Sequence, residues 1–550
     1  MERRVLLAIS LSFLVLFLYQ TYVIPPPPPE ASTPASTTGT AATPLPSATA
    51  APTPVTVPTV DVITGDSDER EIVVETATVR AVFTNRGARL AHWILKDYKN
   101  DAGRQLDLVP DARKLGPALL PFSLRLPDQL MTGRANGGLY QASALNVDAT
   151  TGPASVTFDY SDASGLRISK TFAFDPSGYV VTMTATVQQA DTAVTPVIEW
   201  GPGLGDDIAR AEPASFLSPS YSTPAQAIYH QDGSVERLSQ ATPGRLTGAY
   251  RYVGVDDHYF TALALNDFTT PASVTFDHTP FVVGEAADGT PAGRYVAFSV
   301  QPASASTAQR FYVGPKEFDT LRAVDTELVR VINFGFFAPL SVPLLRALKW
   351  VQTYVGNWGW SIIVLTILIN LAMSPLRQKS VSSMRKMQEI QPQMKAIQDR
   401  YSKYSMTDPA RQKMNEEVMA LYKAKGVNPA SGCVPMLLTF PFLFAFYGML
   451  SQAIELRGAE FFGWIVDLSR PDPLLITPLL MGATMFWQQR ITPTSADPVQ
   501  QKVMMIMPVM FTFMFLSYPS GLVIYWTLSN LWAIGQQYLS TTLAPTPARK

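Results

Sequence analysis

The sequence predicts an α-helical, polytopic membrane protein that carries a large antiparallel β-sandwich outside the cytoplasm. Two features of the 550-residue chain favour this class. Only 16% of residues are charged and 47% are hydrophobic, whereas soluble domains carry about 25% charged residues. Long apolar runs lie at the start and in the last third of the chain, and a region of strand-like alternation separates them. The net charge of −1 indicates no DNA partner.

The N-terminal segment begins with Arg3 and Arg4, followed by an apolar run from Val5 to Ile24. A signal-peptide core is usually only about 7–15 residues long, whereas this run can cross a hydrocarbon layer of ~30 Å. We therefore predict that residues 1–24 form a retained transmembrane anchor, with a cleaved signal peptide as the alternative. Residues 25–60 are rich in Pro, Ala, Ser and Thr, and predict a disordered linker.

Residues 61–320 show the alternation of antiparallel strands. In the run Ile72–Phe83, successive side chains are expected to point to opposite faces, and similar short runs follow, separated by Gly, Pro, Asp and Ser. All four histidines of the chain lie here, but none has a metal-ligand spacing. The sequence contains no HExxH, GxSxG or phosphate-binding glycine loop. We therefore predict no catalytic, metal-binding or cofactor-binding residue and no cofactor.

An amphipathic segment at 321–356, broken at Pro339 and Pro343, is predicted to lie on the external face of the inner membrane. Five further spans are predicted after it. They cover residues 357–376, 430–454, 473–490, 503–518 and 521–540; the last two are separated by a Pro-Ser-Gly turn. The segment 377–426 carries eleven basic and five acidic residues, which places it in the cytoplasm. Both termini, including the tail 541–550, then lie in the cytoplasm and the β-domain lies outside.

The cytoplasmic segment predicts a two-helix hairpin with a methionine-rich face. Met384, Met387, Met394 and Tyr401 recur at helical spacing. One interpretation is that this face packs the two helices together. The other is that its adaptable side chains contact clients or partners. The basic outer face suits anionic lipid headgroups or ribosomal RNA.

Residues 350–376, 427–454, 473–489 and 503–548, which cover the five C-terminal spans up to Gln489, contain no Asp, Glu, Lys or Arg. Ion-coupled transporters usually need ionisable groups at depth, so this absence argues against transport. The spans carry neutral polar residues instead, which either join helices or converge in a wet furrow that lowers the cost of passing a polar segment. The candidate furrow residues are Thr366, Asn370, Thr439, Gln488, Thr512, Tyr525 and Ser529.

Several motifs resemble the YidC family of bacterial inner-membrane insertases. They are Val355-Gly356-Asn357-Trp358-Gly359, Met419-Ala420-Leu421-Tyr422-Lys423, Val427-Asn428-Pro429, Asp497-Pro498, Pro519-Ser520-Gly521-Leu522-Val523 and Tyr312-Val313-Gly314-Pro315-Lys316. The resemblance implies a five-helix insertase core with a hydrophilic groove open to cytoplasm and lipid. It also implies a periplasmic β-supersandwich similar to sugar mutarotases without their activity. Nascent membrane proteins would be the clients, with the Sec translocon as a partner.

Two positions depart from the family pattern. Asn370 stands where the family normally places a positive charge, and Arg377 follows seven residues later on the same helix face. Clients with acidic translocated tails should then be handled less well, unless Arg377 reaches inward. Trp526 stands where the family more often has an aromatic hydroxyl, and we include it among the groove residues.

Three other functions are alternatives to an insertase. A transporter or channel would need intramembrane charge or a continuous polar path. An anchored carbohydrate-active enzyme would leave five spans and the basic hairpin unexplained. An assembly factor for membrane complexes differs from an insertase only in when it acts, and the sequence does not separate these two.

Overall fold

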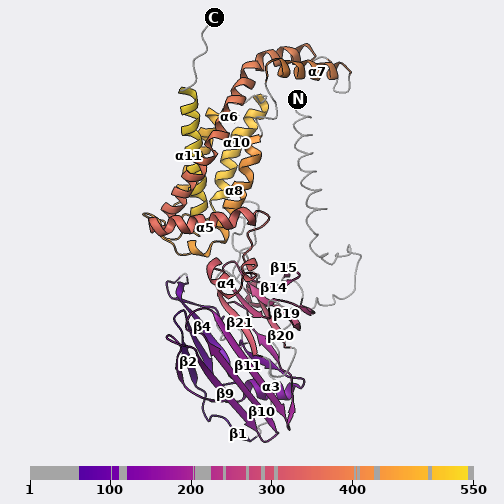
Figure 1. Ribbon diagram of the computed structural model, residues 1–550, viewed down its shortest axis with the longest axis vertical. Helices are drawn as coiled ribbons and strands as arrows, with labels where there is room; N and C mark the ends of the chain where they lie inside the picture. Colours follow the sequence, from indigo (N-terminus) through magenta and orange to yellow (C-terminus); the bar gives the residue numbers. More distant parts are fainter. Residues whose placement is uncertain are drawn as a thin grey trace, which may run out of the picture. The chain divides into compact units, whose positions relative to one another are not determined.

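The computed structural model describes residues 61–542, with gaps at 101, 111–119, 202, 205–224, 239–242, 268–271, 286–290, 303–307, 402–403, 405–408, 427–433 and 493–497 (Figure 1). The predicted anchor 1–24, the linker 25–60 and residues 543–550 of the predicted tail lie outside the described residues.

The β-domain is built from three sheets. The largest has the order β1 (Val62–Thr64), β9 (Ala154–Asp162), β10 (Leu166–Phe174), β11 (Val180–Gln189), β21 (Ala308–Pro315), β18 (Phe260–Leu265), β17 (Tyr252–Asp256), β14 (Gln226–Gln231) and β15 (Ser234–Leu238). Short strands β7 (Gln141–Ala142) and β12 (Thr192–Ala193) pair with β9 and β11. Every pairing in this sheet is antiparallel among the described residues.

Two five-stranded sheets complete the domain. One has the order β16 (Gly244–Ala249), β19 (Ser273–Glu285), β20 (Pro291–Gln301), β13 (Val197–Trp200) and β6 (Ser123–Arg125). The other has the order β5 (Gln105–Asp107), β4 (Arg89–Lys99), β3 (Val79–Thr84), β2 (Glu71–Glu75) and β8 (Asn146–Asp148). The β2–β8 pair is parallel, an exception to the predicted antiparallel pattern. A helix that the alternation did not predict, α3 (Gln129–Gly137), is capped by the Asp128 carboxylate.

The core of the sandwich follows from the alternation along the strands. In β10 every second side chain is buried, and Phe172 meets Phe83 and Phe122 at ring-centroid distances of 4.6 and 5.1 Å. Lys170 occupies one of these inward positions and is fully buried. Its ammonium group donates to the carbonyl groups of Gly87, Ala88 and Phe122 at 2.6, 3.4 and 2.9 Å. Burial lowers the pKa of this lysine well below its usual range.

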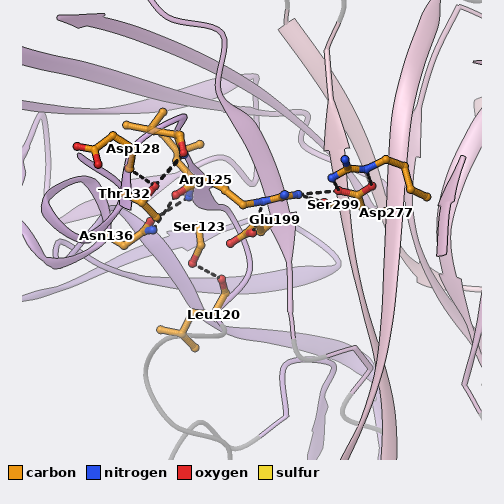
Figure 2. Close-up of polar contacts among 12 residues, drawn as sticks. Leu120, Ser123, Arg125, Asp128, Thr132, Asn136, Glu199, Asp277 and Ser299 are labelled. Atoms are coloured by element: carbon orange, nitrogen blue, oxygen red, sulfur yellow. Dashed lines mark hydrogen bonds and ion pairs between the residues drawn. The ribbon is translucent and has the colours of Figure 1, made fainter. Parts of the chain in front are cut away.

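One arginine connects four of the five strands in the β16–β6 sheet, on the face opposite the core (Figure 2). Arg125 on β6 donates from Nε to Glu199 of β13 at 3.0 Å. Its Nη2 donates to Asp277 of β19 and to the Ser299 hydroxyl of β20, both at 2.8 Å. Arg245 on β16 extends the chain of contacts by bonding Asp277 with two nitrogens. We call these five side chains the Arg125 network.

The C-terminal part of the chain is helical (Figure 1). Its elements are α4 (Phe318–Val324), η3 (Leu328–Val331), α5 (Ala338–Val355), α6 (Trp358–Arg400), α7 (Pro409–Ala424), α8 (Val434–Gln452), η5 (Ile454–Leu456), α9 (Ile476–Ile491), α10 (Pro498–Phe515) and α11 (Ser520–Thr542). In the core, α11 packs against α6 and α9, α9 packs against α10, and α5 packs against α8 and α6.

Two helices run further than the sequence predicted. The α6 helix continues for 43 residues through the expected boundary at 376–377, because the change there is one of hydropathy and not of helix propensity. The α5 helix begins with Pro339 in its first turn and passes through Pro343 without a break. Proline is tolerated in the first turn, where no backbone N–H is needed.

Among the described residues, one helix is long and apolar enough to cross a membrane, at Trp358–Gln378. A shorter apolar stretch lies at Met504–Phe515. The predicted set of six spans is therefore not confirmed and remains a proposal.

Contacts join the β-domain to the helical part. His258 donates from Nε2 to the Ser451 carbonyl of α8 at 2.8 Å, and burial, reinforced by Lys316, lowers the pKa of His258 to about 4. Lys349 on α5 pairs with Glu317, Asp319 and Glu455. These three carboxylates raise the pKa of the Lys349 ammonium, although its partial burial alone would lower it.

Candidate functional site

The first polar face of the helical core lies on α6. The helix begins after Asn357, whose side-chain oxygen accepts the backbone N–H of Trp360 at 3.1 Å. Two turns on, the buried Thr366 hydroxyl donates to the Ile362 carbonyl at 2.6 Å. Asn370 is 9% exposed and its Nδ2 donates to the Thr366 carbonyl at 2.9 Å. The Asn370 amide is therefore held against its own helix and carries no charge.

The second polar face lies on α11, which packs against α6. Tyr525 is buried and its ring stacks on Phe446 of α8, with centroids 4.2 Å apart and an interplanar angle of 15°. Ser529 follows one turn later. Trp526 instead points toward α10, where its ring meets Phe515 at a centroid distance of 5.0 Å.

The remaining predicted groove residues lie elsewhere in the core. Thr512 on α10 donates to the Pro508 carbonyl at 2.7 Å, and its side chain fills the space that a Cβ at Gly482 of α9 would need. Gln488 on α9 is half-buried. The side chain of Thr439 lies outside the described residues. Thr366, Asn370, Tyr525 and Ser529 thus occupy the paired helices α6 and α11. Thr512 lies on α10, and Trp526, although it belongs to α11, faces α10.

The structure adds one polar residue, Gln536, that the sequence pattern did not predict, and it pairs two that the pattern did indicate, Asn530 and Thr484. Gln536 of α11 donates from Nε2 to the backbone carbonyl and hydroxyl of Ser374 on α6, at 3.0 and 2.8 Å. Asn530 donates to the buried Thr484 hydroxyl of α9 at 3.2 Å. The signal in the sequence was the spacing of residues 525, 529, 532 and 536, which places polar atoms on one face of α11.

Two donors on the facing helices α6 and α11 have no partner among the described residues. Arg377 Nη1 and Trp532 Nε1 are buried and form no hydrogen bond within the part of the chain that the structure describes. Buried polar atoms are almost always paired, so each of these donors is a candidate for a partner from outside the chain. We call the Arg377 and Trp532 side chains the donor cluster.

The methionine-rich face of the hairpin lies partly between α6 and α7. Tyr422 of α7 donates to the Met394 sulfur at 3.0 Å. Tyr401 donates to the Glu417 carboxylate at 2.7 Å, and Arg400 pairs with the same carboxylate at 2.8 Å. Met387 is half-buried, and the side chain of Met384 lies outside the described residues. These contacts favour the packing interpretation for Met394 and Tyr401, and client contact remains a prediction.

One end of the α6–α11 pair is closed by the segment between α8 and α9. The backbone N–H groups of Ser520 and Gly521 donate to the carbonyls of Arg470 and Leu468 at 2.7 and 3.0 Å. Asp472 fixes this segment by accepting from the Trp464 indole at 2.9 Å and from the backbone of Thr477 at 2.7 Å.

No group of three or more His, Cys, Asp or Glu side chains able to hold a metal occurs among the described residues. An apolar helical core with uncharged polar groups inside, joined to a β-sandwich, defines the chain as a membrane protein with an appended soluble domain. The family model described as "60Kd inner membrane protein" matches residues 350–546. The model described as "YidC periplasmic domain" matches residues 71–347.

Curated relatives agree with these matches. The membrane protein insertase YidC of Geobacter metallireducens is 33% identical over 560 residues, covering 100% of both chains. That of Oleidesulfovibrio alaskensis is 36% identical over 492 residues, covering 86% of each. The chain belongs to the YidC family of membrane protein insertases.

Solved structures give weaker likenesses. A crystal structure of an active YidC insertase, with its first transmembrane domain resolved, covers 88% of this chain and 95% of that chain, at 17% identity and a TM-score of 0.35. A galactose mutarotase-like protein from Lactobacillus casei covers 44% of this chain and 99% of that chain, at 12% identity and a TM-score of 0.27. Scores this low support no argument about activity.

Proposed function

We propose that this chain inserts integral proteins into the bacterial inner membrane and helps them fold and assemble, alone or beside the Sec translocon. The observation that carries the proposal is the buried, uncharged polar surface between α6 and α11, which ends in the donor cluster. Such a surface gives the polar part of a client temporary partners inside an otherwise apolar environment. No bond is made or broken, and we propose no catalytic or cofactor-dependent step.

The physical basis is the contrast between the inside and the outside of the helical core. Leu368 and Leu371 of α6 are 46% and 57% exposed, and Ile506 and Phe513 of α10 are 65% and 59% exposed. Facing lipid, such side chains offer an apolar client segment a surface along which to partition. An unpaired backbone group in hydrocarbon costs several kcal/mol, and furrow hydroxyls and amides reduce that cost while the polar segment passes.

The closed end of the α6–α11 pair supports a furrow that opens to one side only. The α8–α9 segment is bonded to the start of α11 through Ser520 and Gly521, so a client segment would enter from the other end. The basic hairpin lies toward that other end of α6, which supports a cytoplasmic entrance. We therefore propose a multi-pass topology with six spans, both termini in the cytoplasm and the β-domain in the periplasm.

Partners follow from the same arrangement. Nascent membrane proteins are the clients, and the basic hairpin is suited to anionic lipids and to the ribosome. Met384, Met387, Met394 and Tyr401 remain candidates for contact with clients, although two of them also pack the hairpin. The Lys349 ion pairs hold α5 to α4 and η5, next to the end of the β-domain at Glu317. We assign the β-domain no enzymatic role.

The test is insertion by the purified full-length chain in liposomes that contain no other protein. A small two-span client made in a cell-free system is added, and protease protection of its translocated loop is measured. We expect protection above empty liposomes, and less of it for a Thr366→Val/Asn370→Leu variant. The matched control is Thr247→Val, which removes an exposed hydroxyl of the β-domain. Equal protection in empty liposomes, while a known insertase works in parallel, would contradict the proposal.

The client range depends on Asn370. Because this amide is neutral and bonded to its own helix, it attracts no acidic segment by charge. Asn370→Arg is expected to increase insertion of clients with acidic translocated tails and to leave neutral clients unchanged. No gain for the acidic clients would refute this assignment.

A further inference from the structure

We propose that the donor cluster binds the phosphate group of an anionic phospholipid, at the cytoplasmic boundary of the membrane between α6 and α11. The inference rests on the proposed function only for the orientation of the helices in the membrane. The observation itself is a pair of buried donors without an acceptor among the described residues, Arg377 Nη1 on α6 and Trp532 Nε1 on α11.

The chemistry of the cluster selects the ligand. A guanidinium group and an indole N–H only donate hydrogen bonds. Neither Arg377 Nη1 nor Trp532 Nε1 has a hydrogen-bond partner within the described parts of the chain. A set of donors that includes a fixed positive charge calls for an anion with several acceptor oxygens, and arginine binds phosphate with two parallel hydrogen bonds.

The two helices carry the two donors on neighbouring turns. The Gln536–Ser374 hydrogen bonds fix the α11 turn at residues 532–536 beside the α6 turn at residues 374–377. A helical arginine side chain leans toward the N-terminus of its helix, which directs Arg377 back toward the α6–α11 contact. Its Nη1 is buried, but the side chain as a whole is only half-buried, so a ligand can approach from its exposed part.

The depth of the cluster matches that of lipid headgroups. Arg377 is the penultimate residue of the apolar span Trp358–Gln378. It lies about 28 Å along the helix from Trp358, close to the ~30 Å thickness of the hydrocarbon layer. Trp487 and Tyr538 form an exposed aromatic pair, with Trp487 Nε1 donating to the Tyr538 hydroxyl at 3.3 Å. Such pairs are typical of the membrane–water boundary.

The surface beside the cluster fits the rest of a lipid. Leu531 and Leu539 of α11 are 47% and 60% exposed, and they flank the turn that carries Trp532. A phosphate on Arg377 would leave the acyl chains along this apolar side. A client carboxylate would meet the same donors, but it would not use the exposed leucines. The observations therefore favour lipid, and basic pockets between membrane helices are known to bind such headgroups.

The test uses the full-length chain, purified and delipidated in a neutral detergent. Short-chain phosphatidylglycerol is titrated, with short-chain phosphatidylcholine and inorganic phosphate as separate arms, and bound lipid is counted by native mass spectrometry. We expect a preference for phosphatidylglycerol and weaker binding of inorganic phosphate. Arg377→Gln should weaken the binding of phosphatidylglycerol about tenfold or more, because charge-assisted hydrogen bonds are lost. Trp532→Phe, which keeps the ring and removes the donor, should weaken it by a smaller factor.

The matched control is Arg400→Gln, which removes an arginine of the same helix that is paired with Glu417. It should bind phosphatidylglycerol like the unchanged chain, and circular dichroism checks that each variant is folded. Equal binding by Arg377→Gln, Trp532→Phe and the unchanged chain would overturn the proposal. Displacement of the lipid by an acidic client peptide at equal concentration would overturn it in favour of a client site. Counting bound lipid does not require insertion of a client. A failed insertase assay would therefore not change the conclusion about lipid binding.

Discussion

Two arginines in this chain, Arg125 and Arg377, occupy opposite polar environments. Arg125 donates to Glu199, Asp277 and Ser299 within 3.0 Å and ties neighbouring strands of one sheet together (Figure 2). Arg377 lies on α6, which packs against α11, with Nη1 buried and unpaired among the described residues. The first arginine is satisfied by its own fold, and the second needs a partner from outside.

The comparison distinguishes polar groups that stabilise the fold from polar groups that are available to bind a ligand. A satisfied polar network contributes to stability and should be costly to remove. A buried donor without a hydrogen bond does not stabilise the fold, and its desolvation lowers the free energy of unfolding as long as no ligand is bound. At Arg377 the proposed ligand would offset this cost. The following predictions separate the two kinds of group by measuring stability.

The largest expected effect is at Lys170, a buried cation of the β-domain whose donors are paired within the fold. Lys170→Met removes the donor shared by the carbonyls of Gly87, Ala88 and Phe122. Leaving buried carbonyls unpaired should reduce the free energy of unfolding by about 3 kcal/mol or more. Thermal melting of the full chain in detergent checks this. Arg167→Gln is the control, since the Arg167–Asp191 pair is exposed on both sides and should contribute little. Equal melting of both variants would contradict the prediction.

A comparable effect should appear on acidification, through His258. Its folded pKa of about 4 lies below the ordinary value of 6.5, so the unfolded chain binds the proton first as the pH falls. The contribution of neutral His258 to the free energy of unfolding is therefore fully present above pH 6.5. It is lost between pH 6.5 and pH 4, which lowers the free energy of unfolding by up to about 3 kcal/mol. His258→Gln keeps a donor for the Ser451 carbonyl and removes the titration. Melting temperatures measured across this pH range should fall less steeply for this variant, and parallel curves would exclude His258 as the cause.

A smaller loss is expected for Arg125→Gln. The Arg125 side chain is 39% exposed and that of Asp277 is 19% exposed, so solvent screens part of the interaction. We expect the free energy of unfolding to fall by about 1–2 kcal/mol. Urea unfolding followed by tryptophan fluorescence measures this value. A loss no larger than that of Arg167→Gln would mean that the Arg125 network does not contribute to the stability of the fold.

The smallest stability effect is expected at Arg377, and it completes the comparison. Arg377→Met removes a buried donor that has no partner in the described residues, so the melting temperature in neutral detergent should stay the same or rise. The same substitution type at Lys170 is the reference. A loss at Arg377 as large as that at Lys170 would show that Arg377 is satisfied by the fold, and the distinction between the two regions would fail.

Much of this arrangement follows from the sequence. Alternation predicted the strands of the β-domain, and the residues Thr366, Asn370, Tyr525 and Ser529 were selected from their polarity within apolar helices. In β10, the pattern placed Lys170 on the inward face between Ile168 and Phe172, but not its three carbonyl partners. Those come from segments about 50 to 80 residues earlier in the chain, and only the folded sandwich brings them together.

Helix packing places two of the predicted furrow residues away from the α6–α11 surface. Thr512 was expected in the furrow, but the absence of a side chain at Gly482 lets α9 approach α10 and enclose it. Trp526 points to Phe515 and not to α6. Crossing angles and close approaches of this kind depend on pairs of helices, and a single helix pattern does not contain them. The length of α6 was missed because hydropathy marks where a membrane ends and not where a helix ends.

The central claim is that polar client segments pass along the α6–α11 surface and not over the β-domain. A photo-crosslinking benzoyl-phenylalanine is placed at Tyr525 in one variant and at Tyr229 of β14 in another, each replacing an aromatic ring. Both full-length variants are reconstituted in liposomes, and a client is irradiated during insertion. The account predicts adducts to the polar translocated loop from position 525 and none from position 229. Adducts from position 229 alone would contradict it.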